Sequence, residues 1–544
     1  LGGVFDRVRV ENRRADGTGL NFGVDTRVVR SILWQNNSTT GGVAVALNNS
    51  SLAIENTVVW DSPVAVSLDA SSITVTNSVL EANGVNGRIY YFAASANAQT
   101  AFKGDFNSYL RRNSALLAEQ AMSVGGNDYY SSLPGWSALN GSDRHSMTLD
   151  PQFANAVNGD FHPRSTGGRY VEATRSWTND LVLSPLVDAG SSDWPIGSEP
   201  APNGDIVNVG AYGGTAQASM TQTNPWLRVV SFNEEGIMSG NVLLYWLHGG
   251  LTGDARVSLE YSTDYQVTWK PIASNVPAIN REYAWDVSSL PLSLALNWRV
   301  VYEGNTNVWD ASDLPVVVKS GTYDYYVNDA STTGDVYCSG PGLPCGIANP
   351  TNRLTPVDSL VCLFENFPVG AGDRVFVDTG TYTLPHATSV TIRDRNTGTV
   401  EMPLAILGST NYAAGGSLLM GNGSANGIYL LNTRNIEMRD LRVAHCLNGV
   451  LMQNVSGATL FGMELYNNAT NGLVVSGSSG VQFQNGRVWA NRNYGYVCEG
   501  MGGDLIQNCT FWGNTQGAIW SRVGMQVSNS IMCVTNLAPI YVEE

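Results

Sequence analysis

The last third of the chain repeats with a period of about 22 residues. In each repeat a glycine precedes a short apolar run, and these glycines are spaced by 22, 23, 23 and 22 residues: Gly427, Gly449, Gly472, Gly495 and Gly517. A second apolar series has spacings of 22, 23, 23 and 21 residues: Val443, Leu465, Val488, Phe511 and Met532. Each period holds about three short β-prone runs between Gly, Asn and Ser turns. Because one such period cannot bury its own apolar face, the periods are expected to stack as coils of a solenoid.

The first third of the chain follows a similar but less regular pattern. Its apolar series is spaced by 23, 26 and 21 residues: Val10, Leu33, Val59 and Leu80. Asparagines precede several members of the two series: Asn56, Asn77, Asn485, Asn508 and Asn529. Asparagine tolerates a left-handed backbone and, at a repeated corner, can hydrogen-bond to its copy in the next coil. A propeller would need a period of about 40–50 residues, twice the one observed.

These two regions resemble the right-handed parallel β-helix family. The predicted fold is all-β, with two β-helix halves flanking an immunoglobulin-like or fibronectin III-like β-sandwich. Residues 1–95 are expected to form the C-terminal coils of one β-helix.

Residues 96–223 lose the regular period and are expected to form an irregular β-helix end with a cap. Within them, SPLVDAG (184–190) and NVGAYGGT (208–215) resemble the closing segment of many secreted bacterial β-helix proteins. That resemblance implies a C-terminal cap, which solenoids need to shield their last coil.

Residues 224–320 contain alternating strand patterns with turn residues between them, as in VLLYWL (242–247) and LNWRVVY (296–302). This pattern predicts a β-sandwich, and the stretch resembles fibronectin type III or immunoglobulin-like modules.

Residues 321–371 are expected to form the N-terminal cap of a second β-helix. A short helix is predicted to begin after Thr355, which suits the N-cap position, with Pro356 in its first turn and Asp358 near the positive end of its dipole. Residues 372–544 are then the coils. YYVNDAST (325–332) and GDRVFVDTGTY (372–382) also resemble the start of β-helix units in giant bacterial surface proteins.

The two ends of the chain are in register with one another. If Leu1 is placed directly after Glu544, three apolar runs continue at one-period spacing across the junction. We therefore expect the β-helix to continue from Glu544 into Leu1 of a next copy, either covalently or by docking of separate subunits. A fragment of one β-helix is the alternative.

The charge and hydropathy of the chain argue against two classes of partner, nucleic acids and membranes. With 30 Lys+Arg against 46 Asp+Glu the net charge is −16, which argues against nucleic acid, since phosphate binding needs a basic face. No apolar run reaches the ~18 residues of a membrane helix, so no membrane insertion is expected. The resemblances imply a bacterial extracellular or cell-surface location.

An aromatic residue follows the apolar series in several coils: Tyr466, Trp489 and Trp512, and in the first third Trp34 and Trp60. If Leu465, Val488 and Phe511 point inward, strand alternation turns these rings outward. A stripe of outward rings could bind glycans or a neighbouring fibre. The alternative is that a corner bends and the rings pack inside.

Catalytic and metal-binding patterns are sparse. The sequence has no Asp-Asp pair of the kind that β-helix hydrolases use as acid and base, and no catalytic residue is assigned. Arg442, Glu464 and Arg487 lie beside the aromatic series, where a basic and acidic face is possible, although an exposed mixed-charge stripe is ordinary. No cofactor or metal is expected.

Two weaker assignments concern calcium and cysteine. Asp150, Asn158 and Asp160 offer oxygen atoms to Ca²⁺, but loop stabilisation is the preferred interpretation. Cys338 and Cys345 bracket a Gly/Pro loop and could form a disulfide, while buried free cysteines are equally plausible.

The sequence thus predicts a structural repeat unit of an extracellular filament or giant surface protein, with copies joined end to end. The alternatives are a secreted polysaccharide lyase or hydrolase, and a glycan-binding adhesin.

Overall fold

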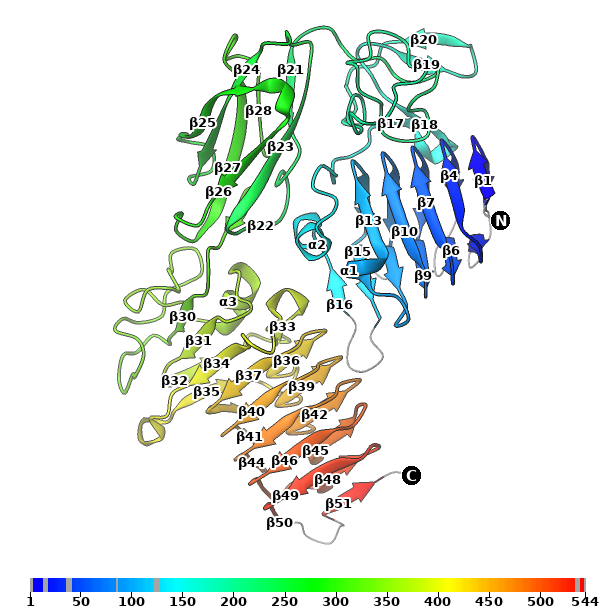
Figure 1. The fold of residues 1–544 in the computed structure, drawn as a ribbon. Helices are drawn as coiled ribbons and strands as arrows, with labels where there is room; N and C mark the ends of the chain where they lie inside the picture. Colours follow the sequence, from blue (N-terminus) through cyan, green and yellow to red (C-terminus); the bar gives the residue numbers. More distant parts are fainter. Residues whose placement is uncertain are drawn as a thin grey trace. The chain divides into compact units, whose positions relative to one another are not determined.

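The computed structural model describes residues 3–12, 18–35, 42–84, 87–121, 128–533 and 539–542. The chain is all-β and divides into two compact units. Of the described residues, the first unit comprises those from 3 to 121 and from 129 to 320, and the second those from 321 to 542. Figure 1 shows a stack of parallel strands in each unit, coloured blue to cyan in the first and yellow to red in the second.

The first unit begins with a three-sided parallel solenoid in which strands that pair are three apart in the chain, except for β15 and β16, which are consecutive. Sheet 1A contains β1 (Gly3–Asp6), β4 (Thr26–Val29), β7 (Ser51–Glu55), β10 (Ser72–Thr76) and β13 (Phe102–Asp105). Sheet 1B contains β2 (Arg9–Glu11), β5 (Ile32–Trp34), β8 (Val58–Ser62), β11 (Val79–Asn83) and β14 (Ser108–Arg112). Sheet 1C contains β3 (Thr18–Phe22), β6 (Val43–Asn48), β9 (Val64–Asp69), β12 (Arg88–Phe92), β15 (Leu116–Gln120) and β16 (Asp128–Tyr130). The coils therefore continue into the range 96–223, where an irregular end of the β-helix was expected.

Two short helices follow the later coils, α1 (Ala98–Ala101) and α2 (Leu133–Asn140). Ser132 caps α2 by accepting a hydrogen bond from the Gly135 N–H, and Gly141 ends it in the left-handed conformation, at φ 69°. Trp136 of α2 is fully buried, and its ring stacks on Tyr90 with centroids 5.9 Å apart. This helix, rather than the SPLVDAG segment, shields the last coil.

The segment 150–222, which we call the flank segment, lies along the outer face of sheet 1B. Its short elements are β17 (Phe153–Asn155), η1 (Ala156–Asn158), β18 (Asp160–Pro163), β19 (Arg169–Val171) and β20 (Ser176–Thr178). Arg9 in the first coil donates to the Gly159 carbonyl, Asn56 in the third to the Asn208 carbonyl, and the Gly210 N–H to the Asn77 carbonyl in the fourth. The prediction that SPLVDAG and NVGAYGGT cap the last coil is therefore wrong, because this segment binds several coils side by side.

Residues 226–318 form two further sheets. One contains β21 (Trp226–Val229), β23 (Asn241–Gly249) and β26 (Glu282–Asp286). The other contains β22 (Ile237–Met238), β24 (Arg256–Ser262), β25 (Lys270–Pro277), β27 (Ser293–Tyr302), β28 (Trp309–Ala311) and β29 (Val316–Val318), with η2 (Ala278–Asn280) between β25 and β26. Most of these strands pair antiparallel, and both sheets contribute to one apolar core that includes Leu244, Trp246 and Trp298. Kinship to fibronectin III or immunoglobulin modules stays a prediction.

The second unit is another three-sided parallel solenoid. Sheet 2A contains β30 (Asp324–Val327), β31 (Arg374–Val377), β34 (Leu404–Gly408), β37 (Ile436–Arg439), β40 (Thr459–Phe461), β43 (Gln482–Gln484), β46 (Asp504–Gln507) and β49 (Met525–Ser528). Sheet 2B contains β32 (Gly380–Thr383), β35 (Ser417–Met420), β38 (Leu441–Ala444), β41 (Glu464–Tyr466), β44 (Arg487–Trp489), β47 (Thr510–Trp512) and β50 (Ile531–Cys533). Sheet 2C contains β33 (Val390–Ile392), β36 (Ile428–Leu431), β39 (Val450–Gln453), β42 (Leu473–Ser476), β45 (Tyr494–Glu499), β48 (Gly517–Ser521) and β51 (Ile540–Val542). Two short 3₁₀ helices lie in the early coils, η3 (Asp394–Asn396) between β33 and β34, and η4 (Tyr412–Ala414) between β34 and β35.

Asparagines hold the corners of this solenoid, as the sequence pattern predicts. Asn485, Asn508 and Asn529 all have positive φ, and the Asn529 amide donates to the Asn508 side-chain oxygen at 2.5 Å. A second ladder is buried: Asn468 donates to Asn491, and Asn491 to Asn514, at 2.9 Å each. This ladder repeats every 23 residues, and none of the sequence predictions includes it.

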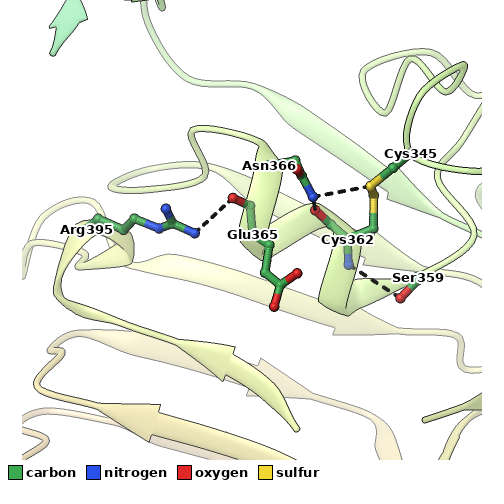
Figure 2. The surroundings of a disulfide bond; sticks show 6 residues. All are labelled: Cys345, Ser359, Cys362, Glu365, Asn366 and Arg395. Atoms are coloured by element: carbon green, nitrogen blue, oxygen red, sulfur yellow. Dashed lines mark hydrogen bonds between the residues drawn. A yellow bond between two sulfur atoms is a disulfide. The ribbon is translucent and has the colours of Figure 1, made fainter. Parts of the chain in front are cut away.

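A short helix and a disulfide form the start of the second unit (Figure 2). Helix α3 (Leu360–Asn366) packs on β33, the edge strand of sheet 2C. Its N-cap is Ser359, which accepts from the Cys362 N–H, so the expected start at Thr355 is four residues early. Cys345 pairs with Cys362, and Cys338 is free. The predicted Cys338–Cys345 disulfide is therefore wrong, because α3 brings Cys362 to Cys345.

Candidate functional site

The outer face of sheet 2B carries two adjacent columns of side chains. Register pairing places Tyr466, Trp489 and Trp512 in one column, which we call the aromatic column. Leu465, Val488 and Phe511, which precede them, are fully buried, so alternation turns the three rings outward, which is one of the two arrangements that the sequence left open. Neighbouring rings are parallel within 3–4°, with centroids 4.3 and 4.6 Å apart.

This stacking limits what the rings can bind. Coplanar side-by-side rings could not approach to 4.3 Å between centroids, so the rings lie face to face. The faces between neighbours cover each other, and the ring edges point outward. Trp512, which is 37% exposed, is the most accessible of the three. At the other end of the column, Arg442 lies over the outer face of Tyr466, 5.6 Å from the ring centroid, so a sugar that needs a free ring face would meet it on the side of Trp512 away from Trp489.

The second column, which we call the charged column, consists of Arg442, Glu464 and Arg487. Glu464 is only 7% exposed and accepts from Arg442 Nε at 3.1 Å, and it also pairs with Arg487. Arg442 further donates to the Gly415 carbonyl and to the Tyr466 hydroxyl, and lies over the Tyr466 ring. Burial raises the pKa of Tyr466. The two guanidinium groups neutralise the one carboxylate and leave one positive charge beside the aromatic column.

Tyr412 and Asp440 extend this polar region toward the earlier coils. The Tyr412 hydroxyl donates to Asp440 Oδ1 at 2.8 Å. Burial, together with this hydrogen bond and the charge of Asp440, raises the pKa of Tyr412 to about 12. The hydroxyl therefore stays protonated at neutral pH, and its one hydrogen is donated to Asp440.

Trp34 and Trp60 occupy the equivalent column of sheet 1B, where they pair in register. They point out of the solenoid, but the flank segment covers them and leaves them 7% and 4% exposed. Their rings meet Phe161 edge to face at 5.9 and 5.7 Å. The prediction of an accessible stripe is therefore wrong for these two residues, because aromatic residues about a hundred positions later fold back over them.

The three calcium candidates are not brought together as a metal site. Asp150 accepts from the Gln152 N–H, Asn158 donates to Asn155, and Asp160 accepts from His162 Nδ1. Within the described residues, no group of three or more His, Cys, Asp or Glu side chains could hold a metal ion. Each candidate thus has a partner in its own loop.

Residues 420–536 match the protein family described as right handed beta helix region. The match lies within the solenoid of the second unit and agrees with its parallel coils. No curated protein matches the chain. Among solved structures, the chain is similar to an alginate lyase from Paenibacillus sp. str. FPU-7, at 18% identity and a TM-score of 0.27. That similarity covers 32% of this chain and 63% of the lyase, so the chain spans less than two thirds of the matched structure.

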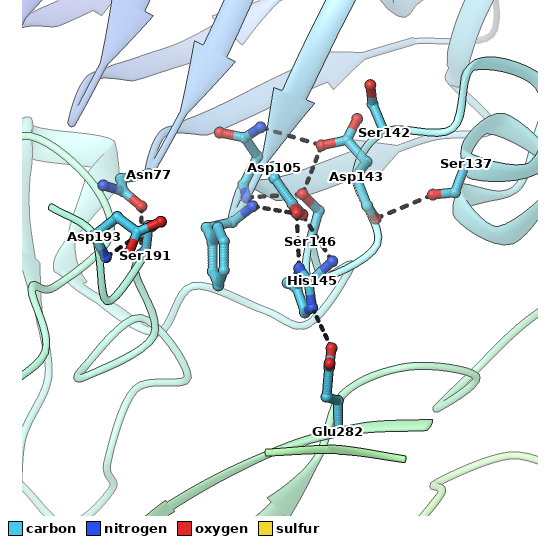
Figure 3. Close-up of polar contacts among 12 residues, drawn as sticks. Asn77, Asp105, Ser137, Ser142, Asp143, His145, Ser146, Ser191, Asp193 and Glu282 are labelled. Atoms are coloured by element: carbon cyan, nitrogen blue, oxygen red, sulfur yellow. Dashed lines mark hydrogen bonds and ion pairs between the residues drawn. The ribbon is translucent and has the colours of Figure 1, made fainter. Parts of the chain in front are cut away.

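A histidine joins the solenoid of the first unit to the antiparallel sheets (Figure 3). His145 Nδ1 lies 2.7 Å from Asp105 on β13, and Nε2 lies 2.8 Å from Glu282 on β26. The ring stacks on Phe106 and meets Tyr245 edge to face. Nothing in the spacing of the five histidines pointed to this contact, since its partners lie 40 and 137 positions away.

A buried aspartate lies beside this joint. Asp143 accepts hydrogen bonds from Tyr109, Trp136, Ser146 and Asn107. Burial raises its pKa to about 6, although these hydrogen bonds oppose the shift. These four hydrogen bonds connect α2 to the last coils. Because all four donors are directed at the one carboxylate, we interpret the network as structural.

None of the helices in the described ranges has the length and apolar character that a membrane span requires.

Proposed function

We propose that the chain is a structural repeat unit of an extracellular filament or a giant bacterial surface protein. In this proposal the β-helix solenoids are rods, the antiparallel sheets are a β-sandwich spacer between them, and the solenoid of one copy continues into the next. The observation that carries the proposal is the match between the strands at the two solenoid ends.

Each solenoid end presents three strand edges. β1, β2 and β3 are the edge strands of sheets 1A, 1B and 1C, and β49, β50 and β51 are the edge strands of sheets 2A, 2B and 2C. Apolar side chains are exposed at both ends, including Val4 at 67%, Ile531 at 66% and Val542 at 60%. Unpaired edges with exposed apolar side chains favour pairing with another chain.

The spacing of these edge strands fits one continuous β-helix. With Leu1 placed directly after Glu544, the first residues of β1, β2 and β3 follow those of β49, β50 and β51 by 22 positions each. The offset of 22 lies between those of the flanking coils. Paired residues are 21 positions apart in the last coil of the second unit, as for Thr510 and Ile531, and 23 apart in the first coil of the first unit, as for Arg9 and Ile32. An equal offset in all three sheets is what a continued coil requires.

The location in the proposal rests on chemistry at the start of the second unit. The Cys345–Cys362 disulfide suits an oxidising compartment, and disulfides are rare in the reducing cytosol. A net charge of −16 keeps long assemblies apart by mutual repulsion.

A cross-link tests the continued register. In the continued sheet, Cys533 on β50 lies opposite Glu11 on β2 of the next copy, at about the 4.8 Å strand spacing that permits a disulfide. We would fuse two copies with Glu544 directly followed by Leu1 and introduce Glu11→Cys in the second copy. Oxidation is expected to link it to Cys533 of the first copy. The matched control is Val4→Cys on β1, which belongs to another sheet and is expected not to link.

The single chain gives the complementary test. Concentrated protein is expected to form filaments with a regular axial repeat in electron micrographs, and the fused dimer to nucleate them. Monodisperse 58.3 kDa particles together with no Glu11–Cys533 link in the fused dimer would overturn the proposal.

A glycan-binding role is the second candidate, favoured by the position of Trp512 beside the charged column. Trp512→Ala would then reduce retention on immobilised acidic polysaccharides, while Trp177→Ala, at a 39% exposed ring of the flank segment, would not. Lyase and hydrolase assays on the same polysaccharides test the remaining alternative, an enzyme that acts at this face.

A further inference from the structure

One loop of the flank segment lies over the first coil of the first unit. Arg9 Nη1 donates to the Gly159 carbonyl at 3.0 Å, and Gly159 packs so closely on Trp34 that a Cβ would come within 2.7 Å of the ring. Val157, two residues earlier in η1, is 82% exposed. An exposed apolar side chain thus lies two residues from the contact with Arg9 on β2, a strand that pairs with β5 on one side and with no described strand on the other.

The last described strand of sheet 2B, β50, also presents an exposed apolar side chain. Met532 pairs with the fully buried Phe511 and is the inward residue of β50. Alternation therefore turns Ile531 and Cys533 outward, in line with Thr510 and Trp512. Ile531 is 66% exposed, so the outer face of this coil also presents an uncovered apolar side chain.

The proposed continuation brings these two side chains together. In the continued sheet, Ile531 lies opposite Arg9 of the next copy, about 4.8 Å away. The loop that rests on Arg9 then borders Ile531 directly. Within the first unit the same segment already covers the outward residues Ile32, Trp34 and Trp60 of sheet 1B. The flank segment would thus cover one further coil, the last coil of the preceding copy.

We propose that residues 155–159 of one copy dock on the outer face of the last coil of the preceding copy, with Val157 packed on Ile531. The partner is a second copy of this chain. This inference rests on the proposed function and adds to it a lateral clasp outside the strand-to-strand contact. The clasp explains why an apolar side chain is exposed on each side of the junction.

A second cross-link tests the clasp separately from the register. In the fused dimer with Cys533→Ser in both copies, Ile531→Cys is placed in the first copy and Val157→Cys in the second. Oxidation is expected to join them. The matched control replaces Val157→Cys by Leu181→Cys, which lies in the same flank segment and is fully exposed, and is expected not to join.

An association measurement gives an independent readout on the single chain. Val157→Asp places a charge against Ile531 and is expected to weaken self-association about fivefold in sedimentation velocity, whereas Val157→Leu keeps it. Both substitutions are at an exposed position, so the fold is retained.

The two cross-links separate the inferences. A Glu11–Cys533 link without a Val157–Ile531 link, and with unchanged association of Val157→Asp, overturns the clasp and leaves the proposed function standing. Absence of both links, together with monodisperse particles of the single chain, overturns both. A Val157–Ile531 link alone overturns the proposed register and therefore the clasp as argued from it.

Discussion

Replacement of His145 by Gln is expected to destabilise the first unit in a pH-dependent way. Both ring nitrogens face carboxylates, Asp105 on β13 and Glu282 on β26. Other titratable groups also lie near the ring. Arg281, which precedes Glu282, donates to the Asp188 and His248 carbonyls, and Asp143 and Tyr245 lie close to His145. Only the doubly protonated ring donates to both carboxylates at once.

The direction follows from the pKa of His145. Burial alone would lower this pKa, but the hydrogen bonds and charges of Asp105 and Glu282 together outweigh burial and raise it. A raised folded-state pKa means that the stabilisation is complete below the unfolded value of about 6.5. It is lost as the pH rises through the folded-state pKa.

The magnitude follows from the two hydrogen bonds. Hydrogen bonds to charged groups contribute about 1.5–3 kcal/mol each, and burial of the charged ring offsets part of that sum. We expect His145→Gln to cost about 2–3 kcal/mol near pH 6. Above the folded-state pKa the neutral ring donates one hydrogen bond, and the cost falls to about 1 kcal/mol.

Urea unfolding of the protein and the variant at about pH 6 and pH 9 measures this difference. The comparison of the two proteins is essential, because burial also raises the pKa of Asp143 to about 6 and of Glu81 to about 7. Because the folded-state pKa values of these two acids are raised, the fold also loses free energy of unfolding as the pH rises above their unfolded-state pKa values. Combination with Glu282→Gln completes a double-mutant cycle, in which the coupling should be present at the lower pH and small at the higher. An equal cost at both pH values, or a coupling that does not change, would refute the reasoning.

Three other substitutions have expected costs. Cys345→Ser removes a disulfide to Cys362 that closes a loop of 17 positions, and should cost about 3 kcal/mol in denaturant unfolding without reductant. Asn491→Ala leaves buried partners of the asparagine ladder unpaired, and should cost about 3 kcal/mol in the same assay. Trp136→Ala opens a cavity over the last coil of the first unit and should cost about 3–5 kcal/mol, with loss of near-ultraviolet circular dichroism.

Each of these has a matched control on the surface. The controls are Cys533→Ser, Gln526→Ala and Leu181→Ala, all at exposed residues. Each should change stability by less than about 0.5 kcal/mol. A buried-site variant that behaves like its control would show that the contact does not contribute as argued.

The sequence was informative wherever structure is local and repeated. The inward positions Leu465, Val488 and Phe511 and the left-handed corners at Asn485 and Asn508 follow from periodicity, because each coil sees the same neighbours as the last. The same packing environment recurs in every coil, so the periodic pattern can still be recognised when one coil is irregular.

What the sequence could not show depends on contacts between distant, non-repeated segments. The burial of Trp34 and Trp60 requires Phe153 and Phe161, which carry no periodic signal that links them to sheet 1B. The Cys345–Cys362 pair requires a helix that starts at Leu360, since spacing alone favoured the nearer Cys338. Such contacts are decided by packing, for which a single sequence contains no direct signal.

The flank segment has a mechanical consequence. Hydrogen bonds between coils run along the solenoid axis, so a chain pulled from its end would unwind coil by coil, one set of bonds at a time. In the first unit the flank segment fastens the coil of Arg9 to those of Asn56 and Asn77, and force on one coil is shared by the others. The later coils of the second unit, where described, are held by the coils before and after them. Under tension these coils should yield first, at low force and in steps of about 22 residues, while the braced solenoid should break at a higher force in a single event.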